Sequence, residues 1–111
     1  MPGVPEISPT EFAARWPNYA GGGDVVLLDV REHDELAIAS VQGALHIPMR
    51  EVPARLTELD PAKPLVVMCH SGGRSRRVAE FLKGTGFPNV FNLMGGIEAW
   101  STQIDSRVPR Y

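Results

Sequence analysis

The stretch LVVMCHSGGRSRRVAEFLKG (residues 65–84) decides the fold of this chain, because it joins an apolar strand to an amphipathic helix through a short loop. Residues 65–69 are continuously apolar, which is typical of a strand covered on both faces. Residues 74–86 are expected to form a helix that ends at a glycine. Its inward side chains are expected to be Val78, Ala79, Phe81 and Leu82. The loop begins directly after Cys69.

The rest of the chain continues this alternation of strands and helices. Further strands are expected at residues 25–30, 44–48 and 89–93, helices at residues 9–16, 32–39, 50–59 and 95–102, and a flexible loop at residues 19–24. Ser8 and Glu11 have the spacing of a capping box at the start of the first helix. The pattern predicts an α/β fold with a mainly parallel sheet and helices on both faces. In such sheets ligands bind at the carboxyl ends of the strands, where Cys69 is expected to lie.

Composition limits the classes of function that this chain can have. Its 111 residues fit one domain, and 43% hydrophobic with 22% charged residues is typical of a globular protein. The net charge of −2 argues against general nucleic-acid binding. The charge is unevenly distributed, however, since residues 61–79 contain four basic residues and no acidic one. This local field favours an anion near Cys69.

A single cysteine excludes an internal disulfide and a cysteine-rich metal site. A lone thiol suits a reducing compartment. The first residues, MPGVPEISPTEF, have no apolar core of a signal peptide, and the longest continuously apolar run, at residues 65–69, is too short for a membrane span. We therefore expect a soluble cytoplasmic protein that binds neither membrane nor nucleic acid.

The loop after Cys69 has the features of an anion-binding cradle. Gly72 and Gly73 permit backbone conformations that point several N–H groups inward, and the following helix adds partial positive charge at its N-terminus. The same features lower the pKa of a thiol from about 8.5 toward roughly 3.5–7.5, which makes Cys69 a candidate nucleophile. Arg74 is expected to contact an oxyanion through two hydrogen bonds. His70, Ser71 and Ser75 add donors in secondary roles.

A buried structural thiol is the alternative interpretation of Cys69. The glycine-containing turn, the arginine and the helix start that follow it are more specific than a lone cysteine, and they favour chemistry. Asp29 and Arg31 end a neighbouring apolar run. They are supporting candidates that either orient the loop or form an ion pair, and the structural role is favoured for both.

Four segments carry motifs of one known family, and they occur in that family's order. They are LLDVRE (27–32), QGALHIP (42–48), CHSGGRS (69–75) and LMGGIEAW (93–100). With these motifs the chain resembles a single-domain rhodanese, a sulfurtransferase module. The resemblance implies a three-layer α/β fold with a five-stranded, mainly parallel sheet. It also implies one domain over residues 1–111, with a core at about 5–103 and a tail at 104–111.

The resemblance implies a chemical role for each part of the loop. Cys69 would take a sulfane sulfur from thiosulfate or a similar anionic donor, carry it as a persulfide, and pass it to a thiophilic acceptor such as cyanide or a thiol. Backbone N–H groups from His70 to Arg74 would hold the terminal sulfur, and Arg74 would help to bind the donor. No metal or organic cofactor is implied. A sulfur-relay protein is an open candidate for a partner.

One segment departs from the family pattern. Ala39 and Ser40 stand where the family commonly has Gly and His. This departure predicts a changed turn or pocket wall and leaves the donor preference open.

Three other functions remain as alternatives. The active-site loops of phosphatases and arsenate reductases of the same fold resemble Cys-x-x-x-x-x-Arg, with five residues between cysteine and arginine. In this chain Cys69 and Arg74 enclose four residues, one fewer. A non-catalytic binding module commonly lacks the cysteine that is present here. A Cys–His hydrolase would need His33, His46 or His70 to lie beside Cys69 in space.

Overall fold

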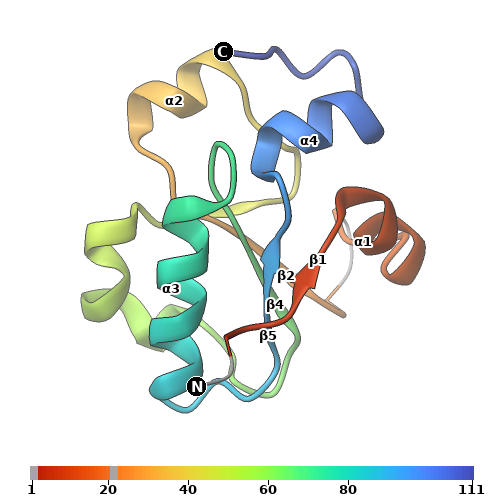
Figure 1. Cartoon of the computed structure of the whole chain (residues 1–111). Coiled ribbons are helices and arrows are strands. Elements are labelled where there is room, and N and C mark those ends of the chain that lie inside the picture. The colour runs from red at the N-terminus through yellow and green to blue at the C-terminus, as the bar shows by residue number, and fades with distance from the viewer. Residues whose placement is uncertain (1–2, 21–22) are drawn as a thin grey trace.

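In the part of the chain that the structure describes, five strands form a single parallel sheet (Figure 1). The computed structural model describes residues 3–20 and 23–111, so part of the expected loop at 19–24 lies outside the described residues. The strands are β1 (Glu6–Ile7), β2 (Val26–Asp29), β3 (Leu45–His46), β4 (Leu65–Met68) and β5 (Val90–Leu93). Their order across the sheet is β1-β5-β4-β2-β3, and all described pairs are parallel. The two-residue strand β1 is too short to leave a pattern in the sequence.

Helices cover both faces of this sheet, which confirms the three-layer α/β fold (Figure 1). They are α1 (Pro9–Arg15), α2 (His33–Ile38), the 3-10 helix η1 (Met49–Glu58), α3 (Gly73–Gly84) and α4 (Gly96–Gln103). The side chains of α3 and η1 pack into one core, and those of α1 and α4 pack into a second core. The strands β4 and β2 lie in the middle of the sheet and separate the two cores.

The continuous apolar runs of β2 and β4 follow from this two-sided burial. Leu28 and Val67 are buried in the core with α3, whereas Leu27 and Val66 are buried in the core with α1 and α4. Successive side chains of a strand point to opposite faces, so a strand with a core on each side needs apolar residues at every position.

The first helix begins as the sequence predicts. The Ser8 hydroxyl accepts a hydrogen bond from the Glu11 N–H (3.1 Å), and the Glu11 carboxylate accepts one from the Ser8 N–H (2.9 Å). The segment expected to be helical at residues 50–59 instead forms 3-10 turns, with non-helical backbone angles at Arg55. Pro53 lies inside this segment and has no N–H to donate, which disfavours a regular α-helix there.

The inward face of α3 differs from the prediction at one position. Val78, Ala79 and Leu82 are buried, but Phe81 is 39% exposed. Phe81 instead lines a small apolar pocket beside η1. After the capping residue Thr85, Gly86 adopts a left-handed conformation (φ +107°), as expected for a glycine that ends a helix.

Within the described ranges, no helix is both long and apolar enough to cross a membrane.

Phe12 and Phe81, two of the four phenylalanines, test the assignment of the cores. Phe12→Ala is expected to lower the free energy of unfolding by about 3–5 kcal/mol, because the Phe12 ring is fully buried against Trp16, Tyr19 and Trp100. Phe81→Ala removes the same atoms from a half-exposed position, so its cost is expected to be about 1 kcal/mol or less. Urea denaturation followed by circular dichroism measures both, and equal losses would contradict this assignment.

Candidate active site

Cys69 lies at the carboxyl end of β4, between the ends of β5 and β2. The loop that follows turns directly into α3, and Gly72 permits the turn with a left-handed backbone (φ +116°). The Gly72 N–H points back to the Cys69 sulfur, with a distance of 3.1 Å between nitrogen and Sγ. Cys69 itself is only 1% exposed. The chain thus places its only cysteine at the base of a closed backbone turn.

The carbonyl groups of this loop are held by the surrounding scaffold. At the start of α4, the N–H of Ile97 donates to the Cys69 carbonyl (2.9 Å) and the N–H of Glu98 to the His70 carbonyl (3.1 Å). The side chain of Asn92 on β5 donates to the Gly72 carbonyl (3.1 Å). In a trans peptide the N–H points opposite to the carbonyl of the same unit, so the bond at the His70 carbonyl leaves the Ser71 N–H free to face the sulfur.

The close approach of α4 to the loop requires a glycine. Gly96 has a left-handed backbone (φ +58°), and a Cβ atom there would collide with the carbonyl oxygens of Cys69 and His70. The sequence motif around Gly95 and Gly96 is therefore part of the site, because it brings the helix N-terminus against the loop.

Hydrogen bonds make Cys69 acidic despite its burial. Burial raises the pKa of the thiol, but hydrogen bonds to the sulfur from the Ser75 hydroxyl and from the N–H groups of Ser75, Gly72 and Ser71 lower it, and the net effect is a lowered pKa. The Ser75 hydroxyl also bonds the Asn92 side chain. The same hydroxyl lies 3.2 Å from the Gly72 carbonyl oxygen, so its single proton serves Asn92, Gly72 or the sulfur at one time. A thiolate is therefore stabilised inside the turn.

Arg74 forms a two-point ion pair with Glu35 on α2. Its two terminal nitrogens lie 2.6 and 2.8 Å from the two carboxylate oxygens. Bonding to Arg74 lowers the pKa of Glu35 to about 2, so the pair is fully charged at neutral pH. The negative charge of Cys69 acts on the same guanidinium. The Arg74 guanidinium is thus held by a partner 39 positions away in the chain.

Asp29 and Arg31 form a second, fully buried ion pair at the end of β2 (2.7 Å). Arg31 also donates to the carbonyl of Ala39 (2.9 Å), which ties β2 to the segment after α2. Asp29 pairs in register with Met68, the residue before Cys69. Neither side chain bonds Cys69, so the structure gives this pair a bracing position next to the loop.

Comparison with known proteins identifies the family. The Rhodanese-like domain family matches residues 15–103. The chain is 36% identical over 112 residues to a Rhodanese-like/PpiC domain-containing protein 12, chloroplastic, of Arabidopsis thaliana, covering 97% of this chain and 38% of that relative. It is also 36% identical over 77 residues to a thiosulfate sulfurtransferase GlpE of Coxiella burnetii, covering 69% of this chain and 72% of that relative.

The chain belongs to the rhodanese-like domain family. A crystal structure of a rhodanese-like domain protein from Staphylococcus aureus superimposes with a TM-score of 0.79 at 26% identity, and the match covers 97% of this chain and 99% of that one. Some relatives are named for sulfur transfer, among them the Coxiella burnetii protein. The chain spans little more than a third of the Arabidopsis relative.

In this rhodanese-like domain, three functional neighbours escaped the sequence analysis. Glu35 holds Arg74, Asn92 holds the Gly72 carbonyl, and Tyr111 stacks on the His70 ring with a centroid distance of 4.1 Å. Glu35 lay in a helix that was expected only from its acidic character, and Asn92 was an isolated polar residue in an apolar strand. That last feature was a usable signal, because a buried amide needs a hydrogen-bonding partner.

The histidines of this rhodanese-like domain do not pair with the cysteine. His33 and His46 pack against each other with ring centroids 4.8 Å apart, and Nε2 of His46 donates to the Arg31 carbonyl (2.6 Å). In the described part of the chain, no histidine side chain forms a hydrogen bond with Cys69, and no cluster of three potential metal ligands occurs. The geometry does not support a Cys–His hydrolase.

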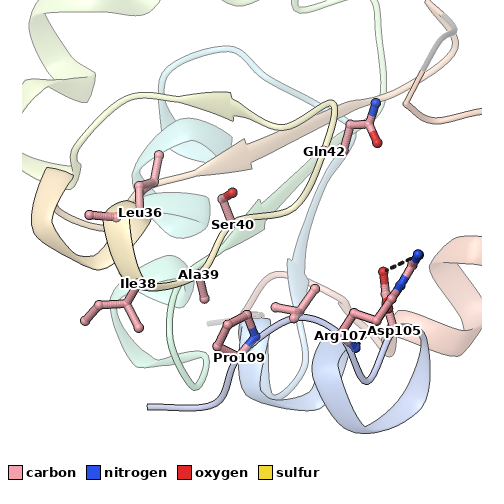
Figure 2. Close-up of a pocket in the computed structure, with 10 residues that line it drawn as sticks. Leu36, Ile38, Ala39, Ser40, Gln42, Asp105, Arg107 and Pro109 are labelled. Carbon is pink, nitrogen blue, oxygen red and sulfur yellow. Dashed lines mark hydrogen bonds and ion pairs between the residues drawn. The ribbon is translucent and has the colours of Figure 1, made fainter.

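The segment that follows α4, residues 104–111, crosses toward α2 above the sheet and is called the strap below (Figure 1). A cavity of about 500 Å³ lies between the strap and the end of α2. Figure 2 shows Pro109 and Arg107 of the strap on one wall, with Ala39 and Ser40 on the other. The departure from the family pattern at Ala39 and Ser40 thus forms a pocket wall, but Cys69 does not line this cavity.

Two glycines test the contact between α4 and the loop. Gly96→Ala is expected to lower the free energy of unfolding by at least about 2 kcal/mol. The alanine would have to adopt a left-handed backbone conformation, and its Cβ would collide with backbone atoms of the loop. Gly84→Ala is the matched control on α3. It meets no atom within 4 Å and is expected to stabilise the helix by roughly 0.5–1 kcal/mol. Denaturant titration measures both, and a neutral Gly96→Ala variant would contradict the close approach.

The Ser75 hydroxyl tests the origin of the lowered cysteine pKa. The rate of alkylation by iodoacetamide follows the thiolate, so in the native protein it should level off below the ordinary thiol pKa of 9.0. Ser75→Ala removes a hydrogen bond to the charged sulfur, so the inflection should move to higher pH and the rate at neutral pH should fall roughly tenfold. Ser8→Ala, at the remote cap of α1, should leave the profile unchanged. An unchanged profile in Ser75→Ala would refute the assigned role.

Proposed function

We propose that this protein is a sulfurtransferase in which Cys69 carries a sulfane sulfur as a persulfide. The observation that carries the proposal is the ring of N–H groups and the Ser75 hydroxyl around the Cys69 sulfur, which lowers the pKa of the thiol. A thiolate is the nucleophile that sulfur transfer requires. The same N–H groups suit the negative charge of a terminal persulfide sulfur, which occupies the same turn.

With thiosulfate as the donor, both steps balance without an added oxidant or reductant. The Cys69 thiolate attacks the outer sulfur of thiosulfate, the sulfur–sulfur bond of the donor breaks, and sulfite leaves with the bonding electron pair. An acceptor such as cyanide then attacks the terminal sulfur of the persulfide. Thiocyanate forms, and the bonding pair returns to Cys69 as the thiolate.

The loop length and the local charge support a small anionic sulfur donor. Only His70, Ser71, Gly72 and Gly73 separate Cys69 from Arg74, and this tight turn suits one added sulfur better than a tetrahedral phosphate or arsenate. These four residues, with Ser75, are the proposed donor-binding groups. Arg74 is the proposed anchor for the donor's charge. Both of its terminal nitrogens bond Glu35, so the donor would be met by the guanidinium N–H groups that this pair leaves unused. A relative named thiosulfate sulfurtransferase supports the same donor.

The free thiol of Cys69 also bears on the cell compartment and on the sulfur acceptor. We place the protein in the cytoplasm, because a persulfide carrier with one free thiol needs a reducing compartment. A thiol or a sulfur-relay protein is the proposed biological acceptor, with cyanide as its laboratory substitute. A non-catalytic binding module is the alternative, and it predicts a thiol that never carries sulfur.

Intact mass spectrometry tests the persulfide directly. The reduced protein is incubated with thiosulfate, and its mass is expected to rise by one sulfur atom. Cyanide is then expected to remove that mass and release thiocyanate. Cys69→Ser should abolish both changes and keep the fold. Arg74→Ala should raise the thiosulfate concentration needed for half-maximal loading by roughly tenfold, the loss of one charged hydrogen-bonding partner.

The control for Arg74→Ala is Arg77→Ala, which removes a basic residue from the next turn of the same helix. It should change loading little. A mass that never rises with thiosulfate or with a persulfide donor would refute the sulfur-carrier function, and sulfur loading of Cys69→Ser would refute the role of Cys69.

A further inference from the structure

The strap brings an aromatic side chain onto the active-site loop. The Tyr111 ring lies parallel to the ring of His70, the residue directly after Cys69, with an interplanar angle of 8° and a centroid distance of 4.1 Å. The Tyr111 hydroxyl and the Arg74 guanidinium both bond the Glu35 carboxylate. Tyr111 therefore joins His70, the first residue after Cys69, to the ion pair of Arg74.

Hydrogen bonds fix the position of this tyrosine. Its hydroxyl donates to the Glu35 carboxylate (2.8 Å) and accepts from the Arg31 guanidinium (2.9 Å). Both partners already serve the site, since Glu35 holds Arg74 and Arg31 pairs with Asp29. The Tyr111 side chain is thus tied to the two ion pairs that flank the loop.

Before Tyr111, the strap is attached to α4 at two residues, and a cavity lies beside it. The Val108 carbonyl accepts from the Ser101 hydroxyl (2.7 Å), and Arg110 pairs with Glu98. Between these contacts and α2 lies the cavity of about 500 Å³ seen in Figure 2. Tyr111 is 37% exposed, so its ring can be displaced at the cost of one stack and two hydrogen bonds.

The burial of Cys69 limits which reagents can reach its sulfur. Cys69 is 1% exposed, so a reagent reaches the sulfur only by passing the residues around the loop. A reagent of a few atoms needs a small opening, whereas a bulky reagent needs a neighbouring side chain to move away. The Tyr111 ring, stacked on the residue that follows Cys69, is a side chain next to the loop that can move away.

We propose that Tyr111 is a specificity-determining residue, which together with His70 narrows the approach to Cys69 and favours small sulfur donors and acceptors over bulky thiols. The proposal rests on the proposed sulfur transfer for its biological meaning. Its physical content, selective access to one thiol, is measurable without any sulfur transfer.

Two alkylating probes of different size test this selectivity. The reduced full-length chain is treated with iodoacetamide or with fluorescein-5-maleimide, and the second-order rate constant for Cys69 is measured for each by intact mass. Tyr111→Ala is expected to raise the ratio of the maleimide rate to the iodoacetamide rate by roughly three- to tenfold, the factor that corresponds to the loss of one aromatic pair. Both probes react with the same thiolate, so a change in the cysteine pKa alone moves both rates together and leaves their ratio unchanged.

Two further variants separate the ring from the rest of the strap. His70→Ala removes the other half of the stack and should raise the same ratio. Arg107→Ala changes an exposed strap residue that pairs with Asp105, and it should leave the ratio at the native value. Circular dichroism verifies that each variant is folded.

The outcomes of this test are independent of those of the mass experiment. An unchanged ratio in both Tyr111→Ala and His70→Ala would overturn the proposal even if Cys69 carries sulfur. A raised ratio in these variants, with the native ratio in Arg107→Ala, would support it even if thiosulfate leaves the mass unchanged. A raised ratio in Arg107→Ala as well would overturn it, because loosening of the whole strap would then explain the effect.

Discussion

The hydrogen bonds that hold the loop carbonyls away from Cys69 are the constraint on which the site depends. Each peptide group has one donor and one acceptor, and a tight turn around a sulfur can present only one kind. The start of α4 binds the carbonyls of Cys69 and His70, and Asn92 binds that of Gly72. The Ser71 N–H, which shares a peptide unit with the held His70 carbonyl, is then free to face the sulfur. Without α4 and β5 the same loop sequence has no reason to keep that orientation.

The charges around the loop form a connected series. Arg74 pairs with Glu35, and the Tyr111 hydroxyl joins Glu35 to Arg31. Buried or half-buried charges need such partners, because an isolated charge in a low-dielectric interior is costly. The series also gives the site a shape. It holds the Arg74 guanidinium and the Tyr111 hydroxyl on one carboxylate, that of Glu35.

The elements that the sequence predicted well are those with a strong local pattern. The apolar runs of β2 and β4, the capping box of α1 and the start of α3 all appeared where expected. Two details differ from the prediction, the exposure of Phe81 and the type of helix at Met49–Glu58, and both have local causes. Phe81 matched the helical period but lies at the edge of the inward face, and the segment Met49–Glu58 contains Pro53, which weakens the α-helix in favour of 3-10 turns.

The sequence by itself determined the strand, the turn and the helix around Cys69, because contiguous apolar residues, glycines and a helix start fix the local backbone. It also determined the family, through four motifs in order. Only the tertiary structure decided which distant side chains complete the site. Glu35, Asn92 and Tyr111 come from separate elements, and they meet the loop only because β5, β4 and β2 lie side by side and the strap crosses back over them. Those contacts depend on strand order and packing, and local sequence carries no record of either.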